Sequence, residues 1–182
     1  MSSKHVMLDL ETLGTTADAV ILSVGAVRFD PDSDAIDDRG FYASVSIDSN
    51  LEAGRRISED TLLWWMRQSE DAQKVFFESK MVLEDALVDF CNWFGDAEFI
   101  WSNGADFDIP MVANALHSFC MQPPWKFYNS RCVRTYKNLP GCRDIKVVNE
   151  AKHNALSDAL AQAKLVQAIQ RRLKANHPMV KP

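Results

Sequence analysis

The sequence predicts an α/β domain in which a mixed five-stranded sheet is flanked by helices. Short runs rich in Val, Ile and Phe, bounded by turn residues, are typical of strands. Longer segments carry apolar residues at the three- and four-residue spacing of a helix that buries one face. No internal repeat or low-complexity tract interrupts this order, so residues 1–182 are expected to form a single domain.

The first three expected strands follow one another closely and predict an antiparallel meander. Gly14 marks the turn after the first strand, and the Asp-rich residues 30–39, which include Pro31, form a surface turn before the third. Pro123 and Pro124 are expected to break the preceding helix and lead into the last strand. The strands are expected at residues 6–10, 19–29, 40–47, 98–101 and 125–128.

The expected helices begin and end at recognisable capping residues. Ser58 or Asp60 can cap the first, Gly95 ends the second, and Pro110 fits the first turn of the third. The last has the longest apolar stripe, from Leu156 to Leu173. The helices are expected at residues 58–68, 83–94, 107–119, 132–138 and 155–174.

Composition indicates a reduced, intracellular protein. The four cysteines form no C-x-x-C pair and have no histidine at zinc-finger spacing, so neither a disulfide framework nor a structural zinc is expected. The N-terminus lacks the apolar core of a signal peptide, and no apolar run is long enough to span a bilayer. We therefore expect a cytoplasmic protein with no membrane partner.

Charge is unevenly distributed although the net charge is −5. Residues 30–60 contain nine acids and three bases, whereas residues 126–152 contain seven bases and two acids. The basic segment could contact the phosphates of a nucleic acid, and the competing interpretation is a solvated surface.

Asp9 and Glu11 end the first expected strand. Side chains two apart in a strand point to the same face, so both carboxylates are aimed at one point while Leu8 and Leu10 pack on the other face. Two like charges about 4 Å apart repel by roughly 4 kcal/mol at an effective dielectric near 20. A divalent cation bound through oxygen ligands, or protonation of one acid, would offset this cost.

Two further acids occur where a strand meets a helix. Asp108 follows the fourth expected strand, and Asp158 lies in the first turns of the last helix. His153 is expected in the loop before that helix, leaning over the same point. Two metal ions about 3.5–4 Å apart would explain four convergent carboxylates, and a histidine can take a proton from an attacking water. Taken singly, an Asp at a helix start is more often a cap than a metal ligand, and a lone histidine in a loop is more often a surface residue than a catalytic base.

Three motifs in order resemble the DEDDh (DnaQ-like) family of 3′–5′ exonucleases, which has a ribonuclease H-like fold. They are residues 9–12 (DLET), 103–108 (NGADFD) and 153–158 (HNALSD). The resemblance covers almost the whole chain and is greatest to phage- and prophage-encoded proteins labelled exodeoxyribonuclease VIII-like.

The resemblance implies a role for each matching residue. Four acids would hold two Mg²⁺ or Mn²⁺ ions: Asp9, Glu11, Asp108 and Asp158. His153 would be the general base. Thr12 and Leu13 match positions that contact the 3′-terminal nucleotide, and Phe107 matches an aromatic residue beside its sugar or base.

The expected activity is hydrolysis of single-stranded DNA from its 3′ end to nucleoside 5′-monophosphates. Two alternatives remain open: an exoribonuclease or oligoribonuclease, and a nucleic-acid-binding or proofreading-type subunit that needs a partner. A homodimer is also left open. Asp106 is a rival to Asp108, Leu13 interrupts the usual Thr-Gly pair, and Trp64, Trp65 and Phe107 fit core packing as well as substrate contact.

Overall fold

A computed structural model describes residues 3–104, 106–149 and 153–176. Its centre is one five-stranded mixed sheet in the order β3-β2-β1-β4-β5. The predicted α/β architecture is therefore confirmed. Its strands are β1 (His5–Thr12), β2 (Ile21–Phe29), β3 (Phe41–Ser44), β4 (Phe99–Ser102) and β5 (Ser130–Cys132).

Strand directions follow from the connections. β1, β2 and β3 form the antiparallel meander, whereas β1 pairs parallel with β4, and β4 pairs parallel with β5. The parallel pairs are joined through helices, as crossovers require. The carboxyl end of β1 therefore lies near the carboxyl end of β4, where α5 begins.

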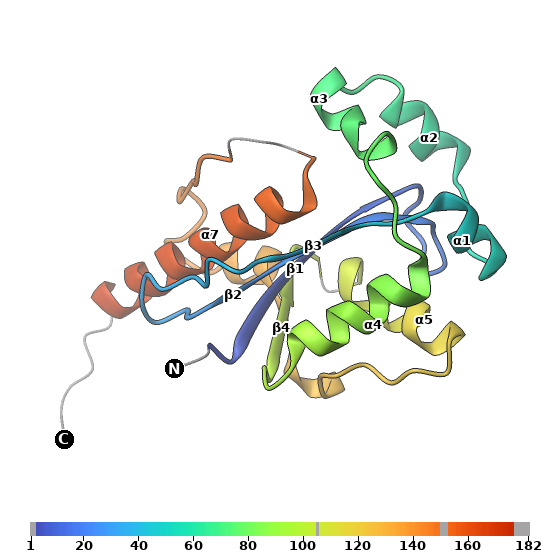
Figure 1. Cartoon of the computed structure of the whole chain (residues 1–182). Coiled ribbons are helices and arrows are strands. Elements are labelled where there is room, and N and C mark those ends of the chain that lie inside the picture. The colour runs from blue at the N-terminus through green and yellow to red at the C-terminus, as the bar shows by residue number, and fades with distance from the viewer. Residues whose placement is uncertain (1–2, 105, 150–152, 177–182) are drawn as a thin grey trace.

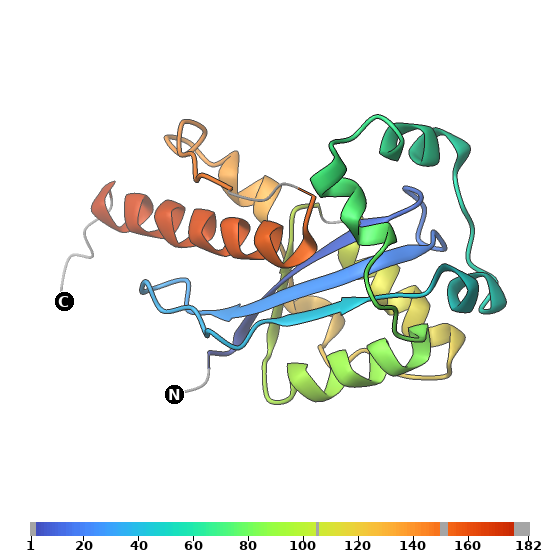
Figure 2. The same ribbon diagram turned by 45° about the horizontal axis from the view of Figure 1, so that its top comes forward.

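Helices cover both faces of the sheet (Figure 1). They are α1 (Ile47–Glu52), α2 (Glu59–Trp65), α3 (Glu70–Gln73), α4 (Leu83–Phe94), α5 (Asp108–Ser118), α6 (Val133–Lys137) and α7 (Ala155–Asn176). Two 3₁₀ turns, η1 (Lys74–Phe76) and η2 (Phe127–Asn129), complete the elements. In the turned view α7 crosses one side of the sheet while α4 lies on the opposite side (Figure 2).

Alternation along β1 decides which side chains reach each layer. Leu8 and Leu10 belong to the larger core with α4 and α5, whereas Met7 packs with Val166 and other apolar residues of α7. Asp9 and Glu11 share the parity of Met7, so they project toward α7. A third cluster, which includes Leu13, Leu22 and Trp65, fills the end of the sheet under α2 and η1.

The fifth strand lies later in the chain than predicted. Trp125 is buried against Phe90 and Phe94 in the core, and Phe127 and Tyr128 are exposed on η2. Residues 130–132 pair with β4 instead, because an edge strand needs backbone hydrogen bonds more than apolar side chains. The short helices α1 and α3 were not predicted from the sequence. Strand β3 also ends at Ser44 rather than at residue 47.

In the described part of the chain no helix is both long and apolar enough to span a membrane.

Candidate active site

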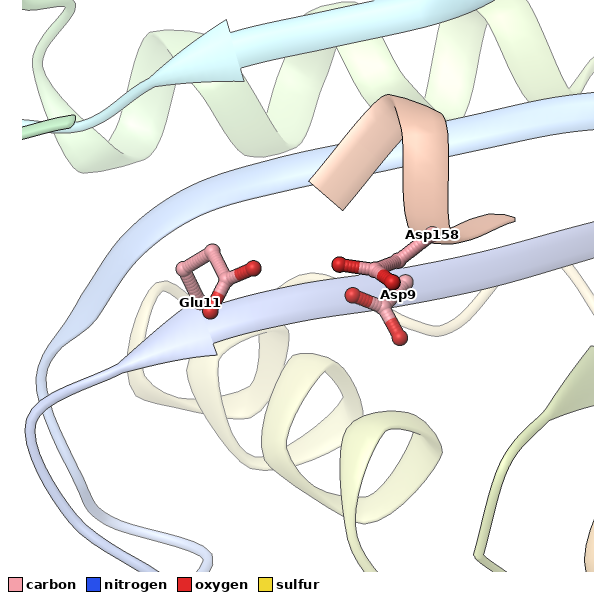
Figure 3. A group of neighbouring side chains, drawn as sticks. All are labelled: Asp9, Glu11 and Asp158. Carbon is pink, nitrogen blue, oxygen red and sulfur yellow. The ribbon is translucent and has the colours of Figure 1, made fainter. Parts of the chain in front are cut away.

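Three carboxylates converge between β1 and α7. One oxygen from each of Asp9, Glu11 and Asp158 lies within 4.8 Å of the others, with Glu11 buried and the other two partly buried. Figure 3 shows Asp9 and Glu11 rising from the strand toward Asp158, which descends from the first turns of the helix. Asp158 is 147 and 149 positions from Glu11 and Asp9 in the chain, and the fold brings these three of the four predicted acids into one group.

A glycine in β2 allows α7 to come this close. Gly25 pairs with Asp9 across the sheet, and a Cβ added at Gly25 would lie 2.2 Å from the backbone of Ala155 and Leu156. Because no real Cβ tolerates that distance, only glycine lets the start of α7 rest on the sheet beside Asp9.

Asp108 is not one of the three converged acids but lies next to β1. It is the first residue of α5 and is 3% exposed, and its Oδ1 accepts a hydrogen bond of 3.1 Å from the backbone N–H of Leu10. Its charge is close enough to raise the pKa of Asp9. The rival Asp106 is exposed.

Burial is the largest cause of the raised pKa at each acid, and neighbouring acids add to it at Asp9 and Glu11. Burial, with the charges of Asp158 and Asp108, raises the pKa of Glu11 to about 8. Burial raises the pKa of Asp108 to about 7, against hydrogen bonds that favour its charged form. Burial and then the charges of Asp108, Glu11 and Asp158 raise the pKa of Asp9 well above its usual range. Burial and the proximity of other acids thus disfavour the charged forms of these carboxylates.

His153 lies in the loop before α7, where it was predicted. Its φ of 62° places it in the left-handed region, which is uncommon for a residue with a side chain. Its backbone N–H donates to Oδ2 of Asp158 over 2.9 Å, and its ring meets the rings of Trp64 and Trp65 edge-on at 5.1 and 6.2 Å. His153 therefore contacts Asp158 through its backbone and the tryptophans of α2 through its ring.

A pocket of about 420 Å³ opens beside the acids. Its lining includes Glu11, Thr12, Trp64 and Phe107. Trp65 also lines it but is otherwise core, since it is 1% exposed and its indole N–H donates to the carbonyl of Thr12. The polar and aromatic walls next to a carboxylate group could hold a nucleotide.

Leu13 is a correction to the predicted substrate contacts. Its side chain is 1% exposed and packs in the cluster with Val20 and Leu22, and its backbone N–H donates to Val20. The chain turns at the end of β1, so Thr12 faces the pocket while Leu13 faces the core.

Two amides at the site escaped prediction. Gln162 donates from Nε2 to Oδ1 of Asp9 over 2.6 Å, and Asn149 donates from Nδ2 to Oδ1 of Asp158. Gln162 follows Asp158 by four residues, so the helical repeat already places both on one face of α7. The four-residue spacing could therefore have identified Gln162 from the sequence. Asn149 lies in the loop before the helix, where no spacing rule predicts its position.

Part of the basic segment lies beside the acids. Arg134 of α6 donates to the carbonyl of Asn103 over 2.9 Å, and its charge lowers the pKa of Asp108 against the effect of burial. Glu150 and Lys152 of this segment lie outside the described residues. The acidic segment pairs elsewhere, with Asp32 and Asp34 bonded to Lys174 and Arg171 at the far end of α7.

The fold is that of ribonuclease H-like nucleases. Cell-death related nuclease 4 superimposes with a TM-score of 0.61 at 14% identity, over 92% of this chain and 64% of that chain. The Mg²⁺- and Mn²⁺-bound form of S. pombe Pop2p gives a TM-score of 0.63 at 12% identity, over 93% of this chain and 84% of that one. This chain thus spans less than two thirds of the first of these nucleases.

Residues 4–170 match the family described as the 3′–5′ exoribonuclease Rv2179c-like domain, and the chain belongs to that family. An exodeoxyribonuclease of Enterobacteria phage T4 is 26% identical over an alignment of 157 residues, and the match covers 71% of this chain and 68% of that protein. The protein is therefore a 3′–5′ exonuclease, a hydrolase acting on nucleic acid, and the predicted resemblance is confirmed.

Proposed function

We propose that this enzyme removes nucleoside 5′-monophosphates from the 3′ ends of single-stranded DNA with the help of two divalent metal ions. The observation that carries the proposal is the convergence of Asp9, Glu11 and Asp158 within 4.8 Å beside a nucleotide-sized pocket.

The acidic group fits Mg²⁺ or Mn²⁺ by its chemistry. All the donors are hard carboxylate oxygens, and oxygens bound to one Mg²⁺ at about 2.1 Å lie about 3–4 Å apart, close to the spacing of the three acids. The raised pKa of Glu11 marks charge that a cation would stabilise. Asp9, Glu11, Asp158 and Asp108 would hold the ions, and Mn²⁺ and Mg²⁺ in the Pop2p structure support this choice. When bound, the ions would supply Lewis-acid stabilisation of the phosphate and activation of water.

The protein groups would then bind and orient the substrate. The terminal nucleotide would occupy the pocket between Thr12, Trp64 and Phe107, which leaves its 5′ phosphate at the acids. His153 would accept the proton of the attacking water as the general base, and its backbone bond to Asp158 would hold it at the site. Aromatic walls suit bases of any sequence because every base has a stacking face.

DNA is the preferred candidate because of the phage T4 relative, an exodeoxyribonuclease that matches over 157 residues. The second candidate is an exoribonuclease or oligoribonuclease, which the family description favours. The two candidates differ in how the pocket would treat the 2′ carbon of the sugar. An exoribonuclease would accept the 2′-hydroxyl of RNA with a hydrogen bond, whereas an exodeoxyribonuclease would have a pocket wall in its place.

The deciding experiment is hydrolysis of 5′-labelled DNA and RNA oligonucleotides of matched sequence. With Mg²⁺ present, we expect a ladder shortened from the 3′ end, release of 5′-monophosphates, and a higher kcat/KM on DNA. Chelator should stop the reaction, and Asp9→Ala or Asp158→Ala should abolish it.

Each result separates the candidates. Faster cleavage of RNA would overturn the DNA preference and leave the exonuclease intact. Binding of oligonucleotide without cleavage, in the presence of Mg²⁺ or Mn²⁺, would instead favour a binding or proofreading-type subunit that needs a partner. Cleavage that persists in chelator or in Asp9→Ala would refute the metal-dependent site.

A further inference from the structure

Of the two amide side chains that contact the acidic group, Gln162 is the one that contacts Asp9. The amide of Gln162 reaches from α7 to β1, and its Nε2 donates to Oδ1 of Asp9 over 2.6 Å. Its Oε1 is also buried and has no hydrogen-bond donor among the described residues. A buried amide oxygen without a donor is unusual, since buried polar atoms are nearly always paired.

We propose that Gln162 is a positioning residue that fixes the carboxylate of Asp9 for metal binding. This inference rests on the proposed function, in which Asp9 is a metal ligand. Ligating carboxylates are commonly held by a further hydrogen bond, and loss of that partner typically weakens metal binding by about 10–100-fold.

The orientation of the amide follows from its chemistry. An ionised carboxylate only accepts hydrogen bonds, so the NH₂ end of Gln162 must face Asp9 and the carbonyl end must face away. The bond to Oδ1 thus restrains the rotation of the Asp9 carboxylate from the side of α7.

The placement of Gln162 is set by the helix rather than by a loop. Gln162 lies one turn after Asp158 on α7, and Gly25 lets that end of the helix rest on β2 opposite Asp9. The helix therefore brings two different groups to the same strand: a carboxylate that joins the acidic group and an amide that restrains Asp9.

The test is the affinity for Mn²⁺ without substrate, measured by titration calorimetry on the whole protein. Gln162→Met keeps the length of the side chain and removes the donor, so the dissociation constant should rise about 10–100-fold. The matched control is Gln167→Met on the same helix. Gln167 is 3% exposed and donates to the carbonyls of Asp30 and Ala35, away from the acids, so its loss should leave the Mn²⁺ affinity unchanged.

Thermal melting without metal provides the structural comparison. If both variants melt lower but only Gln162→Met loses affinity, Gln162 acts on the metal site and not merely on the helix. If Gln162→Met does not fold, Gln162→Asn carries the same test, because its amide is too short to reach Asp9. Unchanged affinity in the folded Gln162 variant would overturn the inference.

Failure of the proposed function looks different. It would show as wild-type protein that binds no Mn²⁺, or as an Asp9→Asn variant that binds it as tightly as wild type. An Asp9→Asn variant that loses Mn²⁺ while Gln162→Met keeps it would reject the role of Gln162 alone.

Discussion

Gly25 of β2 lies directly against the backbone of Ala155, so closely that a Cβ on Gly25 would come within 2.2 Å of the Ala155 carbonyl carbon. Gly25 is also the strand partner of Asp9. The residue that supports the start of α7 is therefore next to Asp9, the first acid of the converged group. The helix that starts at Ala155 brings Asp158 to that acid.

Gly25→Ala should displace α7 and separate Asp158 from Asp9. The obstacle is backbone, which cannot rotate away as a side chain can, so we expect a loss of activity of at least about 10²-fold, the loss that a misplacement of about 1 Å can cause. Overpacking should also cost about 1–3 kcal/mol of stability. Steady-state kinetics and thermal melting measure the two effects.

Gly40→Ala is the control for this prediction. A Cβ there would approach Leu156 of the same helix at 2.7 Å, but the atom it meets is the tip of a flexible side chain. Activity should stay within a few-fold of wild type. Equal damage from both substitutions would show that contact with α7 in general, and not the backbone contact at Gly25, is what matters.

Glu11→Gln should stabilise the metal-free protein while it inactivates the enzyme. Burial and neighbouring acids disfavour the charged form of Glu11, so a neutral amide removes a repulsion. At pH 9 we expect a gain of at least about 1 kcal/mol, or roughly 2–4 °C in Tm for a chain of this size. Activity should fall by about 10³-fold, because several kcal/mol of metal-assisted stabilisation depend on the ligands. A variant that melts lower than wild type at pH 9 in chelator would contradict the electrostatic account.

Metal-free protein should lose stability as pH rises. The pKa values of Glu11 and Asp108 are about 8 and about 7 in the folded chain, above their usual 4.5 and 3.8. Their stabilising contribution is fully present below the unfolded values and is lost as pH rises through the folded ones. We therefore expect Tm in chelator to fall between pH 5.5 and 8.5.

Mg²⁺ should reverse that trend because it competes with protons for the same oxygens. At one hundred times its dissociation constant it should add about 2.7 kcal/mol, and its affinity should increase with pH. Differential scanning calorimetry with Mg²⁺ or chelator at four pH values tests this. If the Tm of the wild type in chelator did not change with pH, and so was no more pH-dependent than the Tm of Glu11→Gln, the linkage to Glu11 and Asp108 would be wrong.

His153→Ala should reduce the rate by about 10²–10⁴-fold, the usual contribution of general acid–base catalysis. The link from this loop to Asp158 is a backbone N–H, which alanine retains, so Mn²⁺ affinity should be nearly unchanged. Calorimetry and single-turnover kinetics separate the two. Full activity in the variant would remove His153 from its proposed role, and a large loss of metal affinity would show that the side chain serves the metal site instead.

The alternation of Leu8 and Leu10 with Asp9 and Glu11 made the sheet and half of the acidic site predictable, because a strand admits only two faces. The apolar stripe of α7 likewise placed Asp158. The fifth strand could not be read in the same way, since Phe127 and Tyr128 are exposed and a polar segment pairs with β4. Leu13 was misplaced because the turn after Thr12 changes which side chain faces the pocket, a three-dimensional feature with no local pattern.

Trp64→Ala should weaken substrate binding more than it slows chemistry. Trp64 is 42% exposed, lines the pocket and meets the ring of His153 edge-on, unlike its buried neighbour Trp65. If a base stacks on it, its loss should cost about 1–3 kcal/mol and raise KM for a short oligonucleotide about 5–100-fold. Trp64→Phe retains a stacking face and should recover most of the affinity, whereas Met66→Ala, at an exposed site on the same helix end, should have no effect. A normal KM with a reduced kcat in Trp64→Ala would mean that the ring supports His153 rather than the substrate.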